Sequence, residues 1–282
     1  MPSYLVTGGR GQLGSDLGAL LGGHAAVLGR DELDIADSEA IERSLAEHRP
    51  EVVVNCAAYH VVDACETDPA PPLQMNVVAV AELARACTRN GARLVHLSTN
   101  YVFPGDRDEP YGEEDLPDPR SIYAISKLAG EYAALSYAPR AIVVRSAGLY
   151  GEQGNASKGG NFVQRILARA EAGEPLRVVA DQRLSPTYTP DLAVAIIEAV
   201  EAGVEGVLHL TSAGACSWHE FTEAILAEAG VEAEVTPAPT EPKPGLADRP
   251  RNGVLARPRA DAAGLTPLRP WREALSAYLA GS

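Results

Sequence analysis

The sequence contains no long apolar run and no paired-cysteine motif. No apolar stretch approaches the ~20 residues that a membrane-spanning helix needs. The first residues enter a strand pattern at once, which leaves no room for a secretory signal peptide. The four cysteines form no C-x-x-C pair, so neither a zinc site nor a redox motif is indicated, and we expect no bound metal. These absences predict a cytoplasmic protein whose thiols are reduced.

Positive charge is also scarce. The chain has 24 lysines and arginines against 38 aspartates and glutamates, which gives a formal net charge of −14. Such a field repels phosphate backbones and anionic membranes, so we expect no binding to nucleic acid or to a membrane. A local basic pocket for a dinucleotide stays compatible with this charge. Apolar residues make up 46% of the 282 residues, which is ample for one large domain or two unequal ones.

Short apolar runs alternate with helical patterns over the first 145 residues. The runs are continuously apolar, as expected for strands of a parallel sheet that helices cover on both faces. This alternation predicts an α/β fold with a doubly wound, Rossmann-like parallel sheet. The expected strands are residues 4–7, 25–28, 52–55, 93–97 and 141–144, and the expected helices are 16–21, 38–48 with Ser38 as its cap, 76–87 and 123–137.

The pattern becomes looser after Arg145. We expect a dinucleotide-binding domain over residues 1–147, which also receives part of 186–203, and a smaller C-terminal lobe over 148–282 that binds the substrate. Glycine-rich residues 151–160 are predicted to form a loop, and residues 236–250, with five prolines, are predicted to form an ordered loop. The other expected elements are helices 162–172, 191–202 and 218–229 and strands 176–179 and 207–210.

Three glycines, Gly8, Gly11 and Gly14, lie between the first expected strand and the first expected helix. A G-x-x-G-x-x-G turn lets the backbone approach a pyrophosphate and lets the helix pack closely on the sheet. The N–H groups and the positive end of the helix then face the phosphates. The position after a strand and before a helix favours a dinucleotide site over a plain tight turn.

The second expected strand should end near the adenosine ribose of such a cofactor. NAD-binding folds often place an acidic residue there, whereas this strand ends in Leu28-Gly29-Arg30. An arginine can pair with the 2′-phosphate of NADP, although Asp31 beside it weakens the argument. NADP(H) is therefore the preferred cofactor, and NAD(H) is the alternative.

Tyr123 and Lys127 form a Y-x-x-x-K pattern at the start of an expected helix. Residues four apart lie on one helical face, so the ammonium can lie near the phenol and favour the phenolate. A tyrosine with an ordinary pKa is a poor base near neutral pH, and a nearby cation corrects this. Upstream, Thr99 ends a strand at the edge of the sheet where ligands bind in such folds. Its hydroxyl can hold a substrate carbonyl beside Tyr123, or can simply cap a turn.

The sequence resembles the extended short-chain dehydrogenase/reductases, and most closely the dTDP-4-dehydrorhamnose reductase family, which completes the synthesis of the L-rhamnose donor. The resemblance rests on the glycine turn, Asn55-Cys56-Ala57-Ala58, Ser98-Thr99-Asn100-Tyr101-Val102-Phe103 and the Tyr123–Lys127 pattern. It continues through residues 159–162, 181–182, 185–188 and 249–252, and so spans nearly the whole chain in order.

The resemblance implies an oxidoreductase that binds NAD(P)H and closes its C-terminal lobe over a nucleotide sugar, with a homodimer as one possible assembly. It implies Thr99, Tyr123 and Lys127 as the catalytic triad. The implied cofactor contacts are Gly8, Arg10, Gly11, Gln12, Leu13, Gly14, Arg30, Asp34, Ile35, Ala57 and Ala58, with Tyr123 and Lys127. The implied substrate contacts are His60, Asn100, Gly148, Asn161, Asp181, Thr187, Arg249 and Asn252.

Three departures from the family pattern fall near the expected sugar site. Asn100 replaces the usual aspartate, His60 replaces a frequent threonine, and Gly148 stands where members carry a tryptophan. His60 can be a substrate contact or a loop residue. Arg249 can pair with the sugar diphosphate or hold the proline-rich loop to the body of the protein. The reaction type depends less on these positions than the identity of the sugar does.

Two other functions compete with a 4-keto-6-deoxy sugar reductase. A related dehydratase or epimerase is one, but dehydration needs an additional acid and base, which dehydratases supply as Asp-Glu directly after the threonine. Here those positions are Asn100 and Tyr101, which disfavours dehydration. The other is an NADP-binding regulatory subunit, because the beta subunit of methionine adenosyltransferase resembles the same family. A turnover assay separates these hypotheses.

Overall fold

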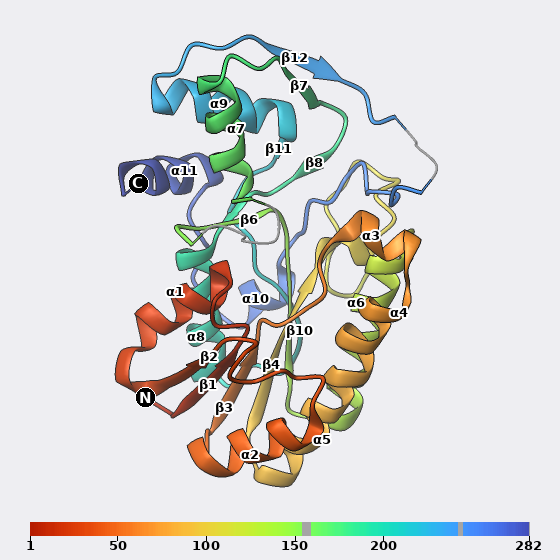
Figure 1. Ribbon diagram of the computed structural model, residues 1–282, viewed down its shortest axis with the longest axis vertical. Helices are drawn as coiled ribbons and strands as arrows, with labels where there is room; N and C mark the ends of the chain where they lie inside the picture. The colour runs from red at the N-terminus through yellow and green to blue at the C-terminus, as the bar shows by residue number, and fades with distance from the viewer. Residues whose placement is uncertain (154–158, 242–244, 282) are drawn as a thin grey trace.

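The structure is a computed structural model that describes residues 1–153, 159–241 and 245–281 (Figure 1). Among these residues, six parallel strands form a central sheet in the order β10-β5-β4-β3-β1-β2. The order reverses between β1 and β3, and ligands bind at such a switch point in doubly wound folds. The strands are β1 (Tyr4–Thr7), β2 (Ala25–Leu28), β3 (Val52–Asn55), β4 (Arg93–Thr99), β5 (Ile142–Ser146) and β10 (Gly206–His209).

Helices cover both faces of this sheet (Figure 1). Helices α1 (Gln12–Leu21) and α8 (Thr189–Glu201) pack on one face, and α2 (Ser38–His48), α5 (Ala79–Asn90) and α6 (Ile122–Tyr137) pack on the other. Alternate strand residues therefore enter different cores: Tyr4 and Val6 pack with α1, whereas Leu5 packs with α2. Both sets are buried, which explains why the strands read as continuous apolar runs.

A third apolar cluster lies in the upper lobe, above the carboxyl ends of the strands (Figure 1). It is built on α7 (Phe162–Glu171), α9 (Trp218–Ala229) and α11 (Trp271–Ala280). Three short strand pairs accompany them: β7 (Leu176–Val179) with β12 (Val235–Ala238), β8 (Arg183–Leu184) with β11 (Cys216–Ser217), and β6 (Leu149–Tyr150) with β9 (Thr187–Tyr188). The smaller elements are η1 (Gly22–His24), α3 (Val62–Thr67), α4 (Ala70–Leu73), the π-helical turn η2 (Gln74–Val78), η3 (Asn100–Val102) and α10 (Pro258–Ala262).

The fold class predicted from the sequence is confirmed, and the strand positions differ by at most two residues at an end. The expected boundary near residue 147 falls just after β5. Helix α8 lies within the expected range 186–203 and packs on the central sheet. Strand β10 also joins this sheet, so the layer extends beyond residue 203. No helix within the described ranges is both long enough and apolar enough to cross a membrane.

Several local expectations were wrong. Helix α1 begins at Gln12 rather than residue 16, and Asp37, not Ser38, caps α2 by accepting hydrogen bonds from the next backbone N–H groups. Residues 235–238 form strand β12 rather than a loop, because parallel pairing with β7 satisfies the backbone despite Pro237. The expected helix 76–87 is divided between η2 and α5, which extends to Asn90. Residues 154–158 of one expected loop and 242–244 of the other lie outside the described residues.

Candidate active site

The glycine turn fits a dinucleotide phosphate in its backbone geometry. Gly8 has φ +65°, and a Cβ there would lie 2.8 Å from the backbone nitrogen of Ala57 at the end of β3. A Cβ at Gly14 would lie 2.5 Å from the carbonyl oxygen of Gly8, so Gly14 lets α1 pack against the turn. Gly11 caps α1 with no side-chain hydrogen bond, and a Cβ there would meet only the Gly8 oxygen, at 3.2 Å. The start of α1 is therefore open to an anionic group.

Two arginines flank the end of β2, where the adenosine ribose of a dinucleotide would lie. Arg10 extends across Gly29, where a Cβ would approach its Nε to 2.7 Å. It pairs with Asp31 at 2.7 Å, and Arg30 pairs with Asp34 at 3.2 Å. The Arg10 and Arg30 side chains are 67% and 79% exposed, so these ion pairs are weak and either guanidinium can turn to a phosphate.

Two other expected cofactor contacts have side chains that point away from the turn. Leu13 packs into the core beneath α1, and Ile35 packs into the core beneath α2. Only their backbone atoms are able to face a cofactor. Gln12 opens α1 directly after the turn.

The loop after β3 is held by Asn76, a residue that the motifs did not identify. Its Oδ1 accepts a hydrogen bond from the Tyr59 backbone nitrogen at 2.8 Å, and its Nδ2 donates to the Tyr59 oxygen at 3.0 Å. The same Nδ2 lies 2.9 Å from the Ser126 hydroxyl on α6. Asn76 lies in the π-helical turn η2, and such turns are frequent at functional sites. It therefore fixes Ala57, Ala58 and the half-buried His60 against the helix that carries Tyr123.

Asn55 connects the carboxyl ends of three strands. Its Oδ1 accepts hydrogen bonds from the Thr7 hydroxyl at 2.6 Å and from the Ala57 backbone nitrogen at 3.2 Å. Its Nδ2 lies 3.1 Å from Nδ1 of His96 on β4. These bonds hold the ends of β1, β3 and β4 in one arrangement at the edge where the expected catalytic residues meet.

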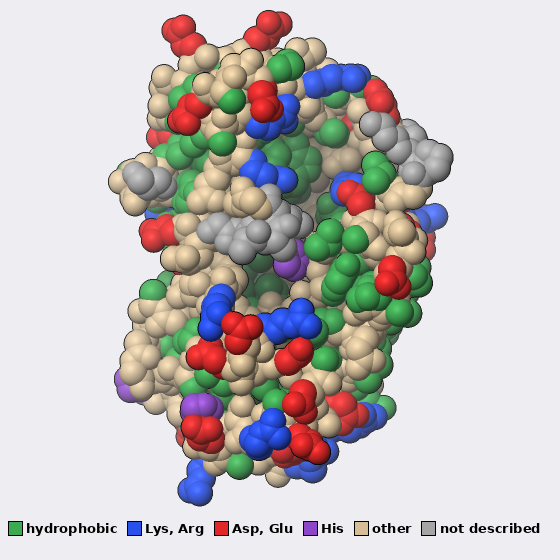
Figure 2. Space-filling model, viewed as in Figure 1, with side chains coloured by type: hydrophobic (Ala, Val, Ile, Leu, Met, Phe, Trp, Pro, Cys, Tyr) green, Lys and Arg blue, Asp and Glu red, His purple; other side chains and the backbone are tan. Residues whose placement is uncertain are grey.

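The structure brings Tyr123 within reach of Thr99 and places Lys127 one turn further along α6, against β4. Thr99 ends β4, and Ser121 caps α6 so that Tyr123 lies in the first helical turn, within hydrogen-bond reach of Thr99. The ring of Tyr101 contacts that of Tyr123 edge-on, with centroids 5.8 Å apart. Nζ of Lys127 donates to the Leu97 carbonyl at 2.6 Å. This geometry suits a proton donor. Figure 2 shows a hollow between the sheet and the upper lobe on this face of the molecule.

Burial dominates the electrostatics of this group. It raises the pKa of Tyr123 above the ordinary value, against the opposing effect of the hydrogen bond with Thr99. The net shift is therefore opposite to the lowering of the pKa expected from Lys127, and the phenol keeps its proton, as the expected proton donor must. Burial also lowers the pKa of Lys127 to about 8, and the Glu131 carboxylate opposes this shift.

The segment around Arg249 closes over the edge of the sheet. Arg249 pairs with Asp63 of α3 at 2.8 Å, and the Ala247 backbone nitrogen donates to the same carboxylate at 3.1 Å. Burial alone would lower the pKa of Arg249, but the hydrogen bond with Asp63, with smaller contributions from Tyr101 and from the Asp63 charge, raises it above its ordinary value. Arg249 thus holds the proline-rich loop to the body of the protein, and its exposed fraction of 30% leaves room for a ligand.

Asn100 is bound to the same C-terminal segment. Its Nδ2 donates to the Gly253 carbonyl at 2.9 Å. The aspartate usual in the family has no N–H to donate, so this residue gives the chain a contact between β4 and the C-terminal lobe that the family residue lacks.

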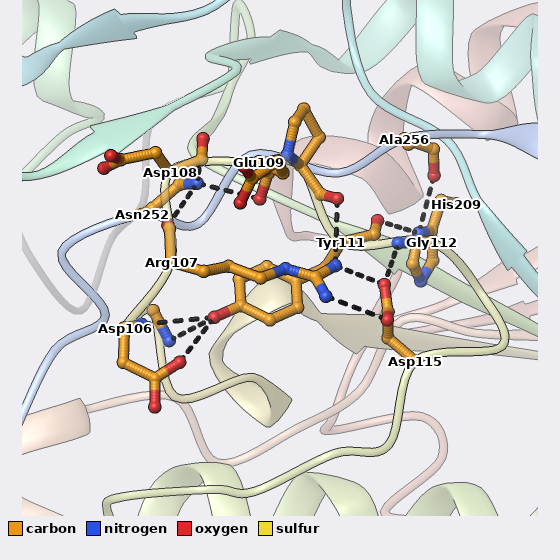
Figure 3. Close-up of polar contacts among 12 residues, drawn as sticks. Asp106, Arg107, Asp108, Glu109, Tyr111, Gly112, Asp115, His209, Asn252 and Ala256 are labelled. Atoms are coloured by element: carbon orange, nitrogen blue, oxygen red, sulfur yellow. Dashed lines mark hydrogen bonds and ion pairs between the residues drawn. The ribbon is translucent and has the colours of Figure 1, made fainter.

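Asn252 and His209 hold the loop that follows the catalytic strand (Figure 3). Nδ2 of Asn252 donates to the carbonyl groups of residues 107, 108 and 109 at 2.9, 3.0 and 3.1 Å. Nδ1 of His209 lies 3.1 Å from the Tyr111 carbonyl and 2.8 Å from the Ala256 carbonyl. Arg107 forms two bonds to Asp115 across the Tyr111 ring. Both halves of the chain therefore shape this loop.

Two other expected substrate residues are engaged within the upper lobe. Asn161 caps α7, and its Nδ2 donates to the Gly151 carbonyl at 2.8 Å. Thr187 is fully buried and donates to the Ser185 carbonyl at 3.0 Å. Their visible contacts stabilise the lobe, and their contact with a substrate stays a prediction.

Asp181 and Gly148 lie next to short strands of the lobe: Asp181 between β7 and β8, and Gly148 directly before β6. Asp181 accepts a hydrogen bond from the Thr240 hydroxyl at 2.6 Å. Gly148 has φ +55°, and a Cβ there would lie 2.6 Å from Cδ1 of Leu184. Leu184 thus occupies the space beside Gly148 that a larger side chain would need.

In the described part of the chain, no group of three His, Cys, Asp or Glu side chains is arranged to hold a metal ion.

Known proteins match this chain over almost its full length. The family model described as RmlD substrate binding domain matches residues 3–282. A dTDP-4-dehydrorhamnose reductase of Streptomyces griseus is 42% identical, over 98% of this chain and 92% of its own length. A probable dTDP-4,6-dihydroxy-2-methyloxan-3-one 4-ketoreductase of Streptomyces antibioticus is also 42% identical, over 96% and 92%. The crystal structure of a Bacillus anthracis dTDP-4-dehydrorhamnose reductase in complex with NADP is 33% identical, with a TM-score of 0.94 over 100% of this chain and 99% of its own.

Proposed function

The chain belongs to the RmlD substrate binding domain family, and from this premise we propose that it is an NADPH-dependent reductase of a dTDP-linked 4-keto-6-deoxy sugar. The family resemblance predicted from the motifs is confirmed. The observation that carries the proposal is the position of Tyr123 in the first turn of α6, within reach of Thr99 at the carboxyl end of β4 and one helical turn before Lys127.

The cofactor residues of this proposal are the glycine turn and the two arginines at β2. The turn and the start of α1 would hold the pyrophosphate, and Arg10 or Arg30 would pair with the 2′-phosphate. NADPH supplies the hydride when it is bound. The loop held by Asn76 would line the nicotinamide side of the site, because it follows β3 at the switch point.

The side chains of this chain supply the proton and the orientation. Tyr123 donates its phenolic proton to the oxygen of the sugar carbonyl as negative charge develops there. Thr99 bonds the same oxygen and holds it beside the phenol. Lys127 would bond the cofactor ribose, and its charge would favour the phenolate that Tyr123 becomes until solvent returns a proton. General acid catalysis of this kind contributes on the order of 10²–10⁴-fold in rate.

The substrate would lie between the sheet edge and the upper lobe. Arg249 is the candidate for its diphosphate, because a guanidinium fork matches phosphate oxygens and this one is partly exposed. His60, Asn100 and Gly148 would face the sugar, and their departures from the family pattern would bear on which sugar is accepted. Asn161, Asp181, Thr187 and Asn252 complete the proposed set. A cytoplasmic location and a homodimer belong to the same proposal.

A screen of dTDP-, UDP- and GDP-linked 4-keto sugars with NADPH tests this function. We expect loss of NADPH absorbance with a dTDP-linked 4-keto-6-deoxy sugar, and slower loss with NADH. The Tyr123→Phe variant is the matched control, since it keeps the fold but lacks the proton. NADPH binding without turnover of any sugar would contradict the reductase and favour a regulatory, NADP-binding role.

A further inference from the structure

Beneath the catalytic residues lies an ion pair that the proposed chemistry does not use. Glu131 of α6 and Arg145 of β5 are 2% and 4% exposed, and Nη2 of Arg145 lies 2.6 Å from Oε2 of Glu131. Nε of Arg145 donates to both carboxylate oxygens, at 2.9 and 3.1 Å. The Ser98 hydroxyl, one residue before Thr99, donates to Oε1 at 2.5 Å.

Stability alone is a weak reason for such a pair. Desolvating two charges costs several kcal/mol per ion, and apolar residues of similar volume are often as stable in such positions. The placement of the carboxylate is more informative. Glu131 follows Lys127 by four residues, so both lie on the face of α6 that packs against the sheet. It therefore touches the strand end that carries Thr99 and shares a helical face with Lys127.

We propose that Glu131 is a positioning residue, held by Arg145 and Ser98, that keeps Lys127 in its ammonium form for the reaction. The inference rests on the reductase function proposed above. It assigns a role in the reaction to a buried pair that the motifs did not identify.

The surroundings of Lys127 explain why it needs such a partner. Cys56 after β3, His96 on β4 and Glu131 on α6 are the titratable groups that act on it or respond to it. Burial raises the pKa of the Cys56 thiol to about 12, and burial and the charge of Lys127 lower the pKa of His96 well below its ordinary value. Both are neutral near pH 7. Of these three groups, Glu131 is the one that offers a negative charge against the burial of Lys127, and the positive charge of Arg145 beside it offsets part of this effect.

The Glu131→Gln variant tests the proposal through a pH profile. The amide is nearly isosteric but carries no charge, so the pKa of Lys127 should fall below its value of about 8. If the ammonium form is active, kcat declines as the pH rises through this pKa. The alkaline limb of the kcat profile should therefore move to lower pH, by about 1 unit or more. The KM for the sugar should change little, and kcat should recover as the pH is lowered.

Two further variants make the result specific. Glu82→Gln removes the charge of an exposed α5 carboxylate that pairs with Arg85. It should leave the alkaline limb of the kcat profile at its wild-type pH. Glu131→Gln combined with Arg145→Met replaces the whole pair by uncharged groups and remains informative if the single variant fails to fold. The alkaline limb of its kcat profile should lie below that of the wild type, by less than in the single variant, because the loss of the Arg145 charge offsets part of the loss of the carboxylate.

A purely structural role for the pair gives a different result. In that case Glu131→Gln would lower kcat equally at every pH, or would lower only the melting temperature. The alkaline limb of the kcat profile would keep its wild-type position, and this outcome would overturn the proposal. The affinity for NADPH, followed against pH by fluorescence titration, is a second readout that needs no turnover, and its alkaline decline should shift in the same direction. If the wild type turns over no sugar, but its NADPH affinity declines at a higher pH than that of Glu131→Gln, the proposed function is contradicted and this inference is not.

Discussion

Two ion pairs near Tyr123 connect distant parts of the chain, and they differ in exposure. Glu131 and Arg145 are 2% and 4% exposed, whereas Asp63 and Arg249 are 41% and 30% exposed. A buried pair has no water to replace a lost partner, so its geometry is fixed. A half-exposed pair can exchange a partner for a ligand at small cost. The first suits the support of catalytic groups, and the second suits a surface that meets the substrate.

The largest effect should come from the catalytic group above the buried pair. Tyr123→Phe removes only the hydroxyl, so kcat should fall by about 10²–10⁴-fold while NADPH affinity barely moves. Steady-state kinetics with the true sugar nucleotide and a fluorescence titration with NADPH measure the two quantities. Near wild-type turnover by the variant would mean that another group donates the proton.

The next effect tests the two ion pairs directly. Arg145→Met leaves the Glu131 charge buried and unpaired, so the free energy of unfolding should fall by about 3–5 kcal/mol. Asp63→Asn breaks the half-exposed pair and should cost only about 0–1 kcal/mol. Urea unfolding of both variants gives the comparison. Equal losses would remove the distinction between a fixed pair and an exchangeable one.

Asn76→Ala should have an intermediate effect. It leaves the backbone N–H and carbonyl of Tyr59 without their partner, at a cost of about 1–3 kcal/mol in stability. The loop after β3 should then loosen, and NADPH affinity should fall as well. Thermal unfolding with and without NADPH separates these two losses, and unchanged values in both would show that the loop holds its shape without Asn76.

Arg249→Ala tests whether the exposed pair meets the substrate. Loss of a charge-assisted bond to the diphosphate should raise the KM for the sugar nucleotide by about tenfold or more, with kcat less affected. Asp63→Asn is the matched control, because it frees Arg249 without removing it and should not raise KM. If the two variants raise KM alike, Arg249 acts by holding the loop.

The smallest effect concerns the cofactor preference. Arg30→Ala should reduce the ratio of NADPH to NADH affinity by only a few-fold, because exposed ion pairs contribute about 0.2–1 kcal/mol and Arg10 also lies near the end of β2. The same titration on Arg10→Ala shows which guanidinium carries the preference. A ratio that neither variant changes would place the 2′-phosphate elsewhere.

Local sequence patterns determined the parallel strands, the glycine turn and the helix that carries Tyr123 and Lys127. The continuous apolar runs predicted the parallel strands, because helices bury both faces of the sheet. The glycine pattern predicted the turn between β1 and α1, and the Tyr123–Lys127 spacing predicted two side chains on one helix, because both depend on residues a few positions apart. Their roles in binding and catalysis stay predictions. These features follow from periodicity and backbone sterics, which act within a single segment.

Only the tertiary structure decided which distant residues meet. Arg145 meets Glu131, Asn76 meets Tyr59, and Arg249 meets Asp63 across 186 residues, and no local pattern marks those partners. Strand β12 exists because β7 pairs with it, although its own proline-containing residues predict a loop. The direction of the shift in the pKa of Tyr123 was predicted wrongly for the same reason. A neighbouring lysine is visible in the sequence, whereas the depth of burial that raises the pKa of the phenol depends on every segment packed around it.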